Sequence, residues 1–367
     1  MLLDSNLTEA QNGQKITAKG FCVNHKDDNF KPFDFSRHAL GQGDILIEIL
    51  YAGICHSDIH SARSEWRDGI YPMVPGHEIA GRVVATGSGV QKFKVGDYAG
   101  VGCMVNAYGK CEACKQSQEQ FCMNGGAVFT YDCKDRFHDN APTYGGYSNN
   151  IVVSEKFAVV VPKDAPLDKV APLLCAGITT YSPLKFSKVK AGDKVGVAGF
   201  GGLGMMAVKY ALSFGAEVSV FARNKNKEQD ALKMGAKALY TTDNLAQVKE
   251  RFNLIISTIP TAYNPMEYVN LLAYGGDFCV VGLPPTDIIP NISLSSLVFA
   301  GHKRVYGSVI GGMKETQEML DFSLKHKIYP ETEIISANDE GAIDKAYENL
   351  TTGKAKFRYV IDMETLK

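Results

Sequence analysis

Short strand-like runs separated by turn residues characterise the first part of the chain. They fall at residues 45–50, 79–84, 94–98 and 151–153, with glycine-rich or polar segments between them. Runs of this length and spacing predict β-strands. We therefore expect the region before residue 166 to form a small, partly closed β-barrel with long functional loops.

From about residue 166 the hydrophobic pattern changes. Residues 194–198 form a short apolar run, a glycine turn follows, and apolar residues in 205–214 recur at helical spacing. Further apolar runs follow at 218–221, 254–256 and 278–281. Strands that alternate with helices predict a doubly wound parallel sheet with right-handed crossovers. The expected fold class is α/β.

The length of 367 residues favours two domains. A strand-like run at 356–361 could return to the first domain. We therefore expect a barrel domain from residues 1–165 and 311–367, and a dinucleotide-binding domain from residues 166–310.

Composition narrows the classes of function. With 45% hydrophobic and 22% charged residues the chain can bury a full core, and its net charge of -1 argues against nucleic acid or an anionic membrane as a partner. Neither a signal peptide nor a membrane span is apparent. Nine cysteines fit a cytoplasmic enzyme with metal-bound thiolates better than a disulfide scaffold. Cys22, Cys133 and Cys279 read as ordinary apolar residues.

Three short segments contain potential metal ligands. Cys55 lies in Gly53–His60, His77 in Pro75–Glu78, and Cys175 in Pro172–Gly177. Two thiolates and one imidazole, with the fourth position left for water or substrate, form an open catalytic zinc site. Glycines near the first two ligands, Gly53 and Gly76, free the backbone there. Scattered cysteines and histidines are more often structural or inert, so this prediction depends on the local contexts.

The segment Gly199–Gly204 has the spacing of a dinucleotide-binding turn, with a strand before it and a helix after it. Gly199 permits the tight turn, Gly201 lets the backbone approach the pyrophosphate, and Gly204 lets helix and strand pack closely. Gly202 and Leu203 complete the turn, and the helix N-terminus faces the phosphates. A Lewis-acid metal together with a nicotinamide predicts hydride transfer to or from a carbonyl.

The end of the second strand of this domain indicates which cofactor binds. An NAD enzyme places a carboxylate there, whereas this chain continues from Ala222 with Arg223, Lys225 and Lys227. Positive charge suits the 2′-phosphate of NADP(H). A solvated basic loop is the alternative. Residues after later strands should line the nicotinamide half of the cofactor, namely Thr258, Val281, Gly282 and Ser308.

Together these motifs resemble the zinc-dependent medium-chain alcohol dehydrogenases, and most closely their cinnamyl alcohol dehydrogenase-like branch of bacterial aldehyde reductases. The resemblance extends over nearly the whole chain. It implies a GroES-like barrel domain and a Rossmann domain. It also implies Cys55, His77 and Cys175 as ligands of a catalytic zinc.

The resemblance implies further roles near the metal. Glu78 matches a carboxylate that approaches the metal when the water leaves. Asp58 matches a group that orients the ligand histidine, with a turn or helix-cap aspartate as the alternative. Ser57 and His60 match a proton path to the rim of the site, although His60 could be a solvated loop histidine.

Two basic residues are matched to the cofactor phosphates by the same resemblance. His56 lies where relatives hold a basic residue near the pyrophosphate, but a neutral imidazole is a weak phosphate partner. Arg358 lies where relatives carry an arginine near the phosphates. A surface or ion-paired arginine is the alternative.

A second metal site lacks one ligand. Cys111, Cys114 and Cys122 match three cysteines of a structural zinc lobe, but Tyr108 stands where relatives have the first cysteine. A closed structural site needs four ligands. Three outcomes are open: zinc held by three cysteines and another ligand, Cys103 as a substitute ligand, or no metal. Because zinc binding contributes to folding, this cysteine lobe should be less stable than the same lobe in relatives with four cysteines.

The sequence thus predicts an NADP-dependent, zinc-containing reductase of aromatic or medium aliphatic aldehydes. Trp66, Tyr71 and Phe129 are candidates for the wall of the substrate pocket, and a plain core residue is the alternative for Trp66. Two rivals are a zinc-independent quinone or enone reductase and a non-catalytic zinc-binding protein. The Cys/His/Cys trio argues against the first, and the pair of Ser57 and His60 argues against the second. The family suggests a homodimer joined through the cofactor-domain sheets.

Overall fold

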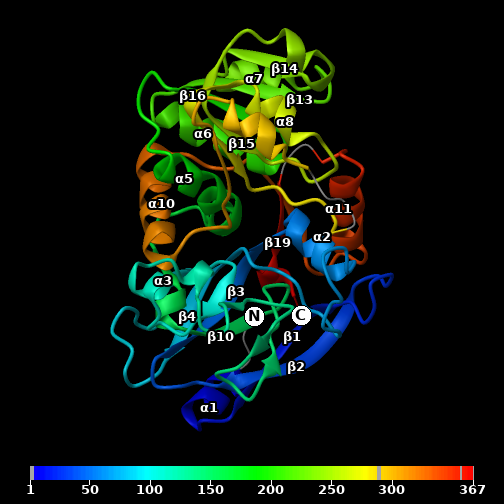
Figure 1. Ribbon diagram of the computed structural model, residues 1–367. Helices are drawn as coiled ribbons and strands as arrows, with labels where there is room; N and C mark the ends of the chain where they lie inside the picture. The colour runs from blue at the N-terminus through cyan, green and yellow to red at the C-terminus, as the bar shows by residue number, and fades with distance from the viewer. Residues whose placement is uncertain (1–3, 287–290, 356–357, 367) are drawn as a thin grey trace. The chain divides into compact units, whose positions relative to one another are not determined.

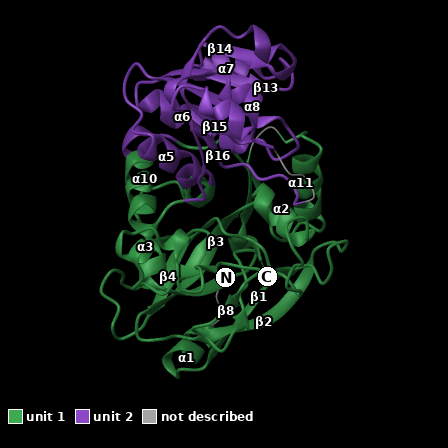
Figure 2. Ribbon diagram, viewed as in Figure 1, with its two compact units in different colours: residues 1–175, 311–324, 329–367 green, residues 176–310, 325–328 purple. Residues whose placement is uncertain are grey.

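The computed structural model describes residues 4–286, 291–355 and 358–366. The chain divides into two compact units (Figure 2): unit 1 comprises residues 1–175, 311–324 and 329–367, and unit 2 comprises residues 176–310 and 325–328. The predicted boundaries differ from these mainly at residues 166–175. That segment lies in unit 1 because helix α4 (Leu167–Pro172) packs against the unit 1 sheet.

Unit 1 is built on a seven-stranded sheet with the order β11-β5-β4-β3-β19-β18, in which β10 also pairs with β3. The strands are β3 (Asp44–Gly53), β4 (Ile79–Thr86), β5 (Tyr98–Val101), β10 (Asn150–Ser154), β11 (Val159–Val161), β18 (Thr332–Ser336) and β19 (Arg358–Asp362). Neighbours are antiparallel except β18 and β19. The last strand therefore does return to the first unit, although residues 356–357 of the predicted run lie outside the described residues.

Further helices and strands accompany this sheet (Figure 1). They are α1 (Asp4–Gln11), β1 (Lys15–Cys22), β2 (Lys31–Ala39), α2 (His56–Ala62), β6 (Met104–Asn106), α3 (Glu112–Lys115), β7 (Val128–Phe129), β8 (Lys134–Asp135), β9 (Ala141–Pro142), α10 (Met313–His326) and α11 (Ala342–Thr351). One predicted strand is largely a turn. Residues 94–97 precede β5 and form a turn, in which Gly96 adopts a left-handed conformation with φ +89°.

Unit 2 contains a six-stranded parallel sheet with the order β14-β13-β12-β15-β16-β17. Its strands are β12 (Lys194–Ala198), β13 (Glu217–Ala222), β14 (Ala238–Thr241), β15 (Phe252–Ser257), β16 (Leu272–Val280) and β17 (Arg304–Gly307). Its helices are α5 (Ile178–Phe186), α6 (Gly202–Ser213), α7 (Glu228–Met234), α8 (Pro265–Val269) and α9 (Leu294–Val298). The predicted α/β class is confirmed.

The core of unit 2 explains why its strands read as continuous apolar runs. Phe221, Phe252 and Phe278 are fully buried between sheet and helices, and the rings of the first two meet edge to face with centroids 5.4 Å apart. Parallel strands are covered on both faces, so they alternate little. Among the described helices, none has an apolar stretch long enough to cross a bilayer.

Candidate active site

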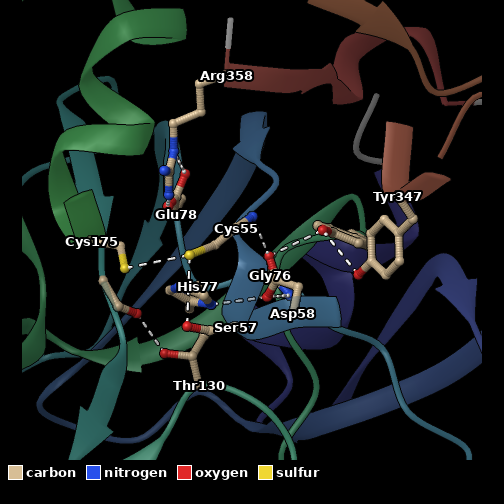
Figure 3. A network of polar contacts seen from close by, with 12 residues as sticks. Cys55, Ser57, Asp58, Gly76, His77, Glu78, Thr130, Cys175, Tyr347 and Arg358 are labelled. Carbon is tan, nitrogen blue, oxygen red and sulfur yellow. Dashed lines mark hydrogen bonds and ion pairs between the residues drawn. The ribbon is translucent and has the colours of Figure 1, made fainter. Parts of the chain in front are cut away.

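Four residues that could bind a metal meet inside unit 1. The ligand atoms of Cys55, His77, Glu78 and Cys175 all lie within 4.8 Å of one another, and all four side chains are buried. The Sγ atoms of Cys55 and Cys175 are 3.9 Å apart (Figure 3). The predicted trio therefore converges, although its members are far apart in the sequence.

The local backbone positions each ligand. Cys55 follows β3 and is the N-cap residue of α2, whereas His77 and Glu78 directly precede β4. Cys175 lies in a π-helical turn over Leu173–Gly177, between α4 and α5. Such turns are frequent at functional sites. The hydrophobic pattern of the sequence did not predict this π-helical turn.

His77 has one ring nitrogen bound and one free. Nδ1 lies 2.9 Å from Oδ1 of Asp58, and Nε2 is buried without a hydrogen-bond partner. A carboxylate can only accept a hydrogen bond, so Nδ1 carries a proton, and in the neutral ring Nε2 has the lone pair. A buried nitrogen of this kind costs stability unless something binds it, and two nearby thiols make zinc the fitting group.

Asp58 is buried and accepts four hydrogen bonds. Besides Nδ1 of His77, its donors are the backbone N–H of Cys55 at 2.8 Å, the backbone N–H of Gly76 at 3.2 Å and the hydroxyl of Tyr147 at 3.1 Å. The residue caps α2 and also orients the histidine. From the sequence, Asp58 was either a helix-cap aspartate or the group that orients the ligand histidine. In the structure the same carboxylate does both.

The two glycines near the ligands serve different needs. Gly76 has φ +105°, a left-handed conformation that favours glycine. Gly53 does not have a positive φ; instead a Cβ there would lie 2.1 Å from Oε2 of Glu78. Close approach to Glu78, rather than backbone freedom, is what requires glycine at residue 53.

The charges around Cys55 favour its thiolate. Its contact with Cys175, together with Arg358 and His77, holds the pKa of Cys55 well below its usual range despite burial. The sequence analysis missed a neighbour of this pair. Cys103 contacts Cys175, and this contact lowers the pKa of Cys103. Cys103 therefore lies at the catalytic cluster and does not substitute for a ligand in the second site.

Glu78 is ion-paired with Arg358 of β19. Nε of Arg358 lies 3.2 Å from Oε2 of Glu78, and its Nη2 contacts Oε1 more closely. Both side chains are buried, and burial raises the pKa of Glu78 to about 7 even though Arg358 opposes the shift. Of the alternatives for Arg358, the ion-paired arginine describes its position. This guanidinium is engaged by Glu78 rather than presented to solvent.

The predicted proton path lies along α2. Ser57 Oγ is 3.7 Å from Sγ of Cys55, and His60 lies three residues further on. His60 is not at a solvated rim: it is buried, its Nδ1 contacts Glu65, and its ring stacks on Trp66 with centroids 4.7 Å apart. Its Nε2 is buried without a partner. His56 is partly buried, and burial lowers its pKa, so the neutral ring predominates.

The second cysteine group assembles as three thiols. Sγ of Cys111 lies 3.3 Å from that of Cys114 and 4.0 Å from that of Cys122. Backbone N–H groups of Cys114 and Met123 lower the pKa of Cys111 to about 6, as expected for a metal-binding thiolate. Tyr108, at the position of the missing cysteine, is 42% exposed. In the described part of the chain no further histidine, cysteine or carboxylate joins the three thiols.

The glycine turn of unit 2 has the expected geometry. Gly199 follows β12 with φ +94°, and α6 begins at Gly202 with Gly201 as its N-cap. A Cβ on Gly204 would lie 2.0 Å from the carbonyl oxygen of Gly199, whereas a Cβ on Gly201 would meet nothing within 4 Å. Close packing therefore requires glycine at residue 204, whereas the space around Gly201 is open to a phosphate.

Other predicted cofactor residues follow the carboxyl ends of parallel strands, where ligands bind in this fold. Arg223 and Lys227 come after β13, and Arg223 is exposed. The later positions follow β15, β16 and β17, namely Thr258, Val281, Gly282 and Ser308. A Cβ on Gly282 would lie 2.4 Å from the Thr258 carbonyl carbon, so these segments are in close contact.

Comparison with known proteins agrees with this geometry. Residues 41–163 match the model of the alcohol dehydrogenase GroES-like domain, and residues 202–325 match that of the zinc-binding dehydrogenase domain. A probable formaldehyde dehydrogenase of Bacillus subtilis is 45% identical over 94% of this chain and 97% of its own length. An NADP-dependent alcohol dehydrogenase of Mycolicibacterium smegmatis is 44% identical over 90% of this chain and 94% of its own length.

Solved structures give the same picture. The structure of CAD from Helicobacter pylori complexed with NADP(H) has a TM-score of 0.91 and 63% identity, over 96% of this chain and 99% of that one. A cinnamyl alcohol dehydrogenase from Sorghum bicolor has a TM-score of 0.90 and 36% identity, over 96% of this chain and 99% of that one. The resemblance inferred from the motifs is confirmed. This chain belongs to the zinc-binding alcohol dehydrogenase family, in its cinnamyl alcohol dehydrogenase-like branch.

Proposed function

We propose that this protein is a zinc-dependent oxidoreductase that transfers a hydride between NADP(H) and a primary alcohol or aldehyde. The observation that carries the proposal is the buried Nε2 of His77, which has no hydrogen-bond partner and lies in one cluster with Cys55 and Cys175. Three ligands leave a fourth position for substrate, which distinguishes a catalytic from a structural zinc.

When bound, zinc polarises the carbonyl oxygen and the nicotinamide carries the hydride. The side chains of the protein prepare this chemistry. Cys55, His77 and Cys175 would hold the metal, and Asp58 fixes the His77 tautomer that presents a lone pair. Glu78, held by Arg358, keeps a carboxylate within 4.8 Å of the ligand atoms.

Ser57 and His60 would move the proton that accompanies hydride transfer. The Ser57 hydroxyl is near the metal cluster, and His60 lies on the same face of α2 because residues three apart are neighbours on a helix. The Glu65 carboxylate contacts Nδ1 of His60, so Nε2, which is buried without a hydrogen-bond partner, is the ring atom that would carry the transferred proton. Burial beneath Trp66 would keep bulk water away from this path.

The preference for NADP(H) rests on Arg223. It follows β13 at the position where an NAD enzyme carries an acid, and no ion-pair partner for it is seen within the described ranges. A free guanidinium there suits a 2′-phosphate. The relatives include NADP-dependent alcohol dehydrogenases and a structure complexed with NADP(H), which supports the same choice. His56 stays a proposed contact of the pyrophosphate.

We place aromatic and medium aliphatic aldehydes first among substrates, with reduction as the working direction. Several relatives are described as cinnamyl alcohol dehydrogenases. Trp66, Tyr71 and Phe129 are candidates for the apolar wall. Of these, Phe129 is 40% exposed, whereas the Tyr71 hydroxyl is bound to Ala62 and Ser64.

We further propose a homodimer and a cytoplasmic location. Strand β17 lies at the end of the unit 2 sheet, and nearby Leu294, Val298 and Phe299 are strongly exposed. An open strand edge beside apolar side chains favours pairing with a second copy. All nine cysteines are unpaired, as is typical of proteins in reducing compartments.

One assay separates this proposal from its rivals. NADPH oxidation should be measured with benzaldehyde or cinnamaldehyde, before and after removal of zinc by a chelator, with zinc added back. Activity that is lost and then restored supports the proposal. Activity that survives chelation with an enone substrate would indicate a zinc-independent reductase. A folded, zinc-loaded protein with no turnover of aldehydes would indicate a non-catalytic protein.

A further inference from the structure

A second histidine cluster lies in unit 1, outside the active site. His38 lies near the end of β2, His138 in the turn between β8 and β9, and Asp44 at the start of β3. Each offers a ligand atom within 4.8 Å of the other two. His38 and His138 also line a surface pocket together with Asp135 and Thr143. Because these elements are distant in the sequence, only folding brings the group together.

Both imidazoles hold Nδ1 in the way that metal-binding histidines do. Nδ1 of His138 lies 2.7 Å from Oδ2 of Asp135, and Nδ1 of His38 lies 2.9 Å from the carbonyl oxygen of Ala39. A carbonyl and a carboxylate can only accept, so each Nδ1 donates and each neutral ring keeps its lone pair on Nε2. No hydrogen bond to either Nε2 is seen among the described residues. Partners of this kind on Nδ1 orient a ring for a metal on Nε2.

The charge and access of the cluster suit a cation. The side chains of His38 and His138 are 25% and 30% exposed, so an ion can enter from solvent. Asp44 is held by the backbone N–H of Gly41 at 3.0 Å. Burial lowers the pKa of His38, which favours its neutral form. The hydrogen bond to Asp135 raises the pKa of His138, so a metal ion that binds this imidazole displaces a proton from the ring.

The rings lie parallel, with centroids 3.7 Å apart and planes at 7°. One ion can take both Nε2 atoms only after at least one ring rotates about its Cβ–Cγ bond. His38 is the ring that has to turn, because its Nδ1 faces Oδ2 of Asp44 at 3.8 Å, and because rotation of His138 would break its Nδ1 bond to Asp135. The stack thus places the ligands close together, and the rotation completes the geometry.

We propose that His38, His138 and Asp44 bind one divalent transition-metal ion of the Ni²⁺ or Zn²⁺ type at a site separate from the catalytic zinc. Imidazole ligands select such ions over Mg²⁺ and Ca²⁺, which prefer all-oxygen sites. Asp135 is then a positioning residue that fixes the His138 tautomer. The site is distinct from both cysteine groups, since it shares no residue with either.

Equilibrium dialysis of the zinc-loaded, full-length protein against Ni²⁺ tests this proposal. Bound nickel and retained zinc are measured in the same sample, so that exchange at the cysteine sites is seen separately. The wild type should bind one more nickel per chain than the double variant His38→Gln/His138→Gln. The matched control is His25→Gln, because His25 also lies near a carboxylate, 3.3 Å from Asp27, but has no second imidazole in such a group. It should bind nickel like the wild type.

Two further variants keep the test decisive if the double variant does not fold, as judged by circular dichroism. His138→Gln changes only a half-exposed turn and should weaken nickel binding by at least about tenfold. Asp135→Asn should weaken it in the same direction through the tautomer. Equal nickel uptake by the wild type and the folded histidine variants would overturn the proposal and leave the two rings as a packing contact.

Discussion

His77 and Asp58 form a buried pair in which Nδ1 of the imidazole lies 2.9 Å from Oδ1 of the carboxylate. The pair leaves Nε2 of His77 buried and without a partner. The same carboxylate accepts the backbone N–H of Cys55 at 2.8 Å. One side chain therefore positions two of the three residues that we propose as zinc ligands.

Replacing Asp58 with asparagine should weaken zinc binding. The amide has one acceptor oxygen where Asp58 accepts four hydrogen bonds, and its N–H₂ group faces other donors. We expect a loss of zinc affinity of about 10–100-fold. Zinc retained after dialysis against graded chelator is the measurement. Asp132→Asn is the control, since Asp132 is also buried and hydrogen-bonded but lies outside the cluster; equal retention by both variants would contradict the assignment.

Replacing Arg358 with methionine should destabilise unit 1. The change leaves Glu78 buried without its ion pair, at a cost of about 3–5 kcal/mol. Adding Glu78→Gln should recover part of that loss, because no uncompensated charge remains. Urea unfolding gives the free energies. The exposed pair of Lys237 and Glu217 supplies the control, and Lys237→Met should change stability little. No recovery in the double variant would mean that the pair is not what stabilises this region.

Replacing Gly53 with alanine should also destabilise the protein, by about 1–3 kcal/mol. The new Cβ would lie 2.1 Å from Oε2 of Glu78, so the carboxylate or the strand must shift. A Cβ on Gly43 meets nothing within 4 Å, which makes Gly43→Ala the matched control. Thermal unfolding of both variants checks the difference. Equal melting temperatures would show that the site tolerates the added methyl group.

The three-thiol group should bind zinc weakly in the natural chain. At the two cysteine sites together we expect between one and two zinc ions per chain, with the ion of the three-thiol group lost first to a mild chelator, because a closed site needs four ligands. Tyr108→Cys should bring the content close to two and slow that loss. Phe137→Cys adds a thiol at a residue that is also 42% exposed and should change nothing. A zinc ion held by Cys111, Cys114 and Cys122 as firmly as the one at Cys55, His77 and Cys175 would refute this prediction.

Arg223 should decide the choice of cofactor. Arg223→Ala removes a charge-assisted contact to the 2′-phosphate, so kcat/KM for NADPH should fall about 10–100-fold. The value for NADH should change little, and Arg223→Asp should shift the preference toward NADH. Lys233→Ala, an exposed basic residue on α7, serves as the control. Equal use of NADPH and NADH by the natural protein would contradict the proposal.

Local motifs were enough to predict much of this protein. The glycine turn could be read from the sequence because its needs are local: a left-handed residue at Gly199 and close packing at Gly204. The change from strand runs to alternating strands and helices predicted the parallel sheet for the same reason, since periodicity reports burial residue by residue. The contexts of Cys55, His77 and Cys175 likewise predicted a group of side chains that the structure brings together.

Contacts between distant segments were decided only by the tertiary structure. The pairing of Glu78 with Arg358 joins residues 280 positions apart, and nothing near either one specifies the other. The same holds for Cys103 beside Cys175, the burial of His60 and the stack of His38 on His138. Local sequence sets which conformations a segment favours, whereas the packing of the whole chain sets which side chains meet. The sequence by itself therefore determined the ligand types, the cofactor turn and the fold class, and the tertiary structure alone decided the partners that orient, charge and bury them.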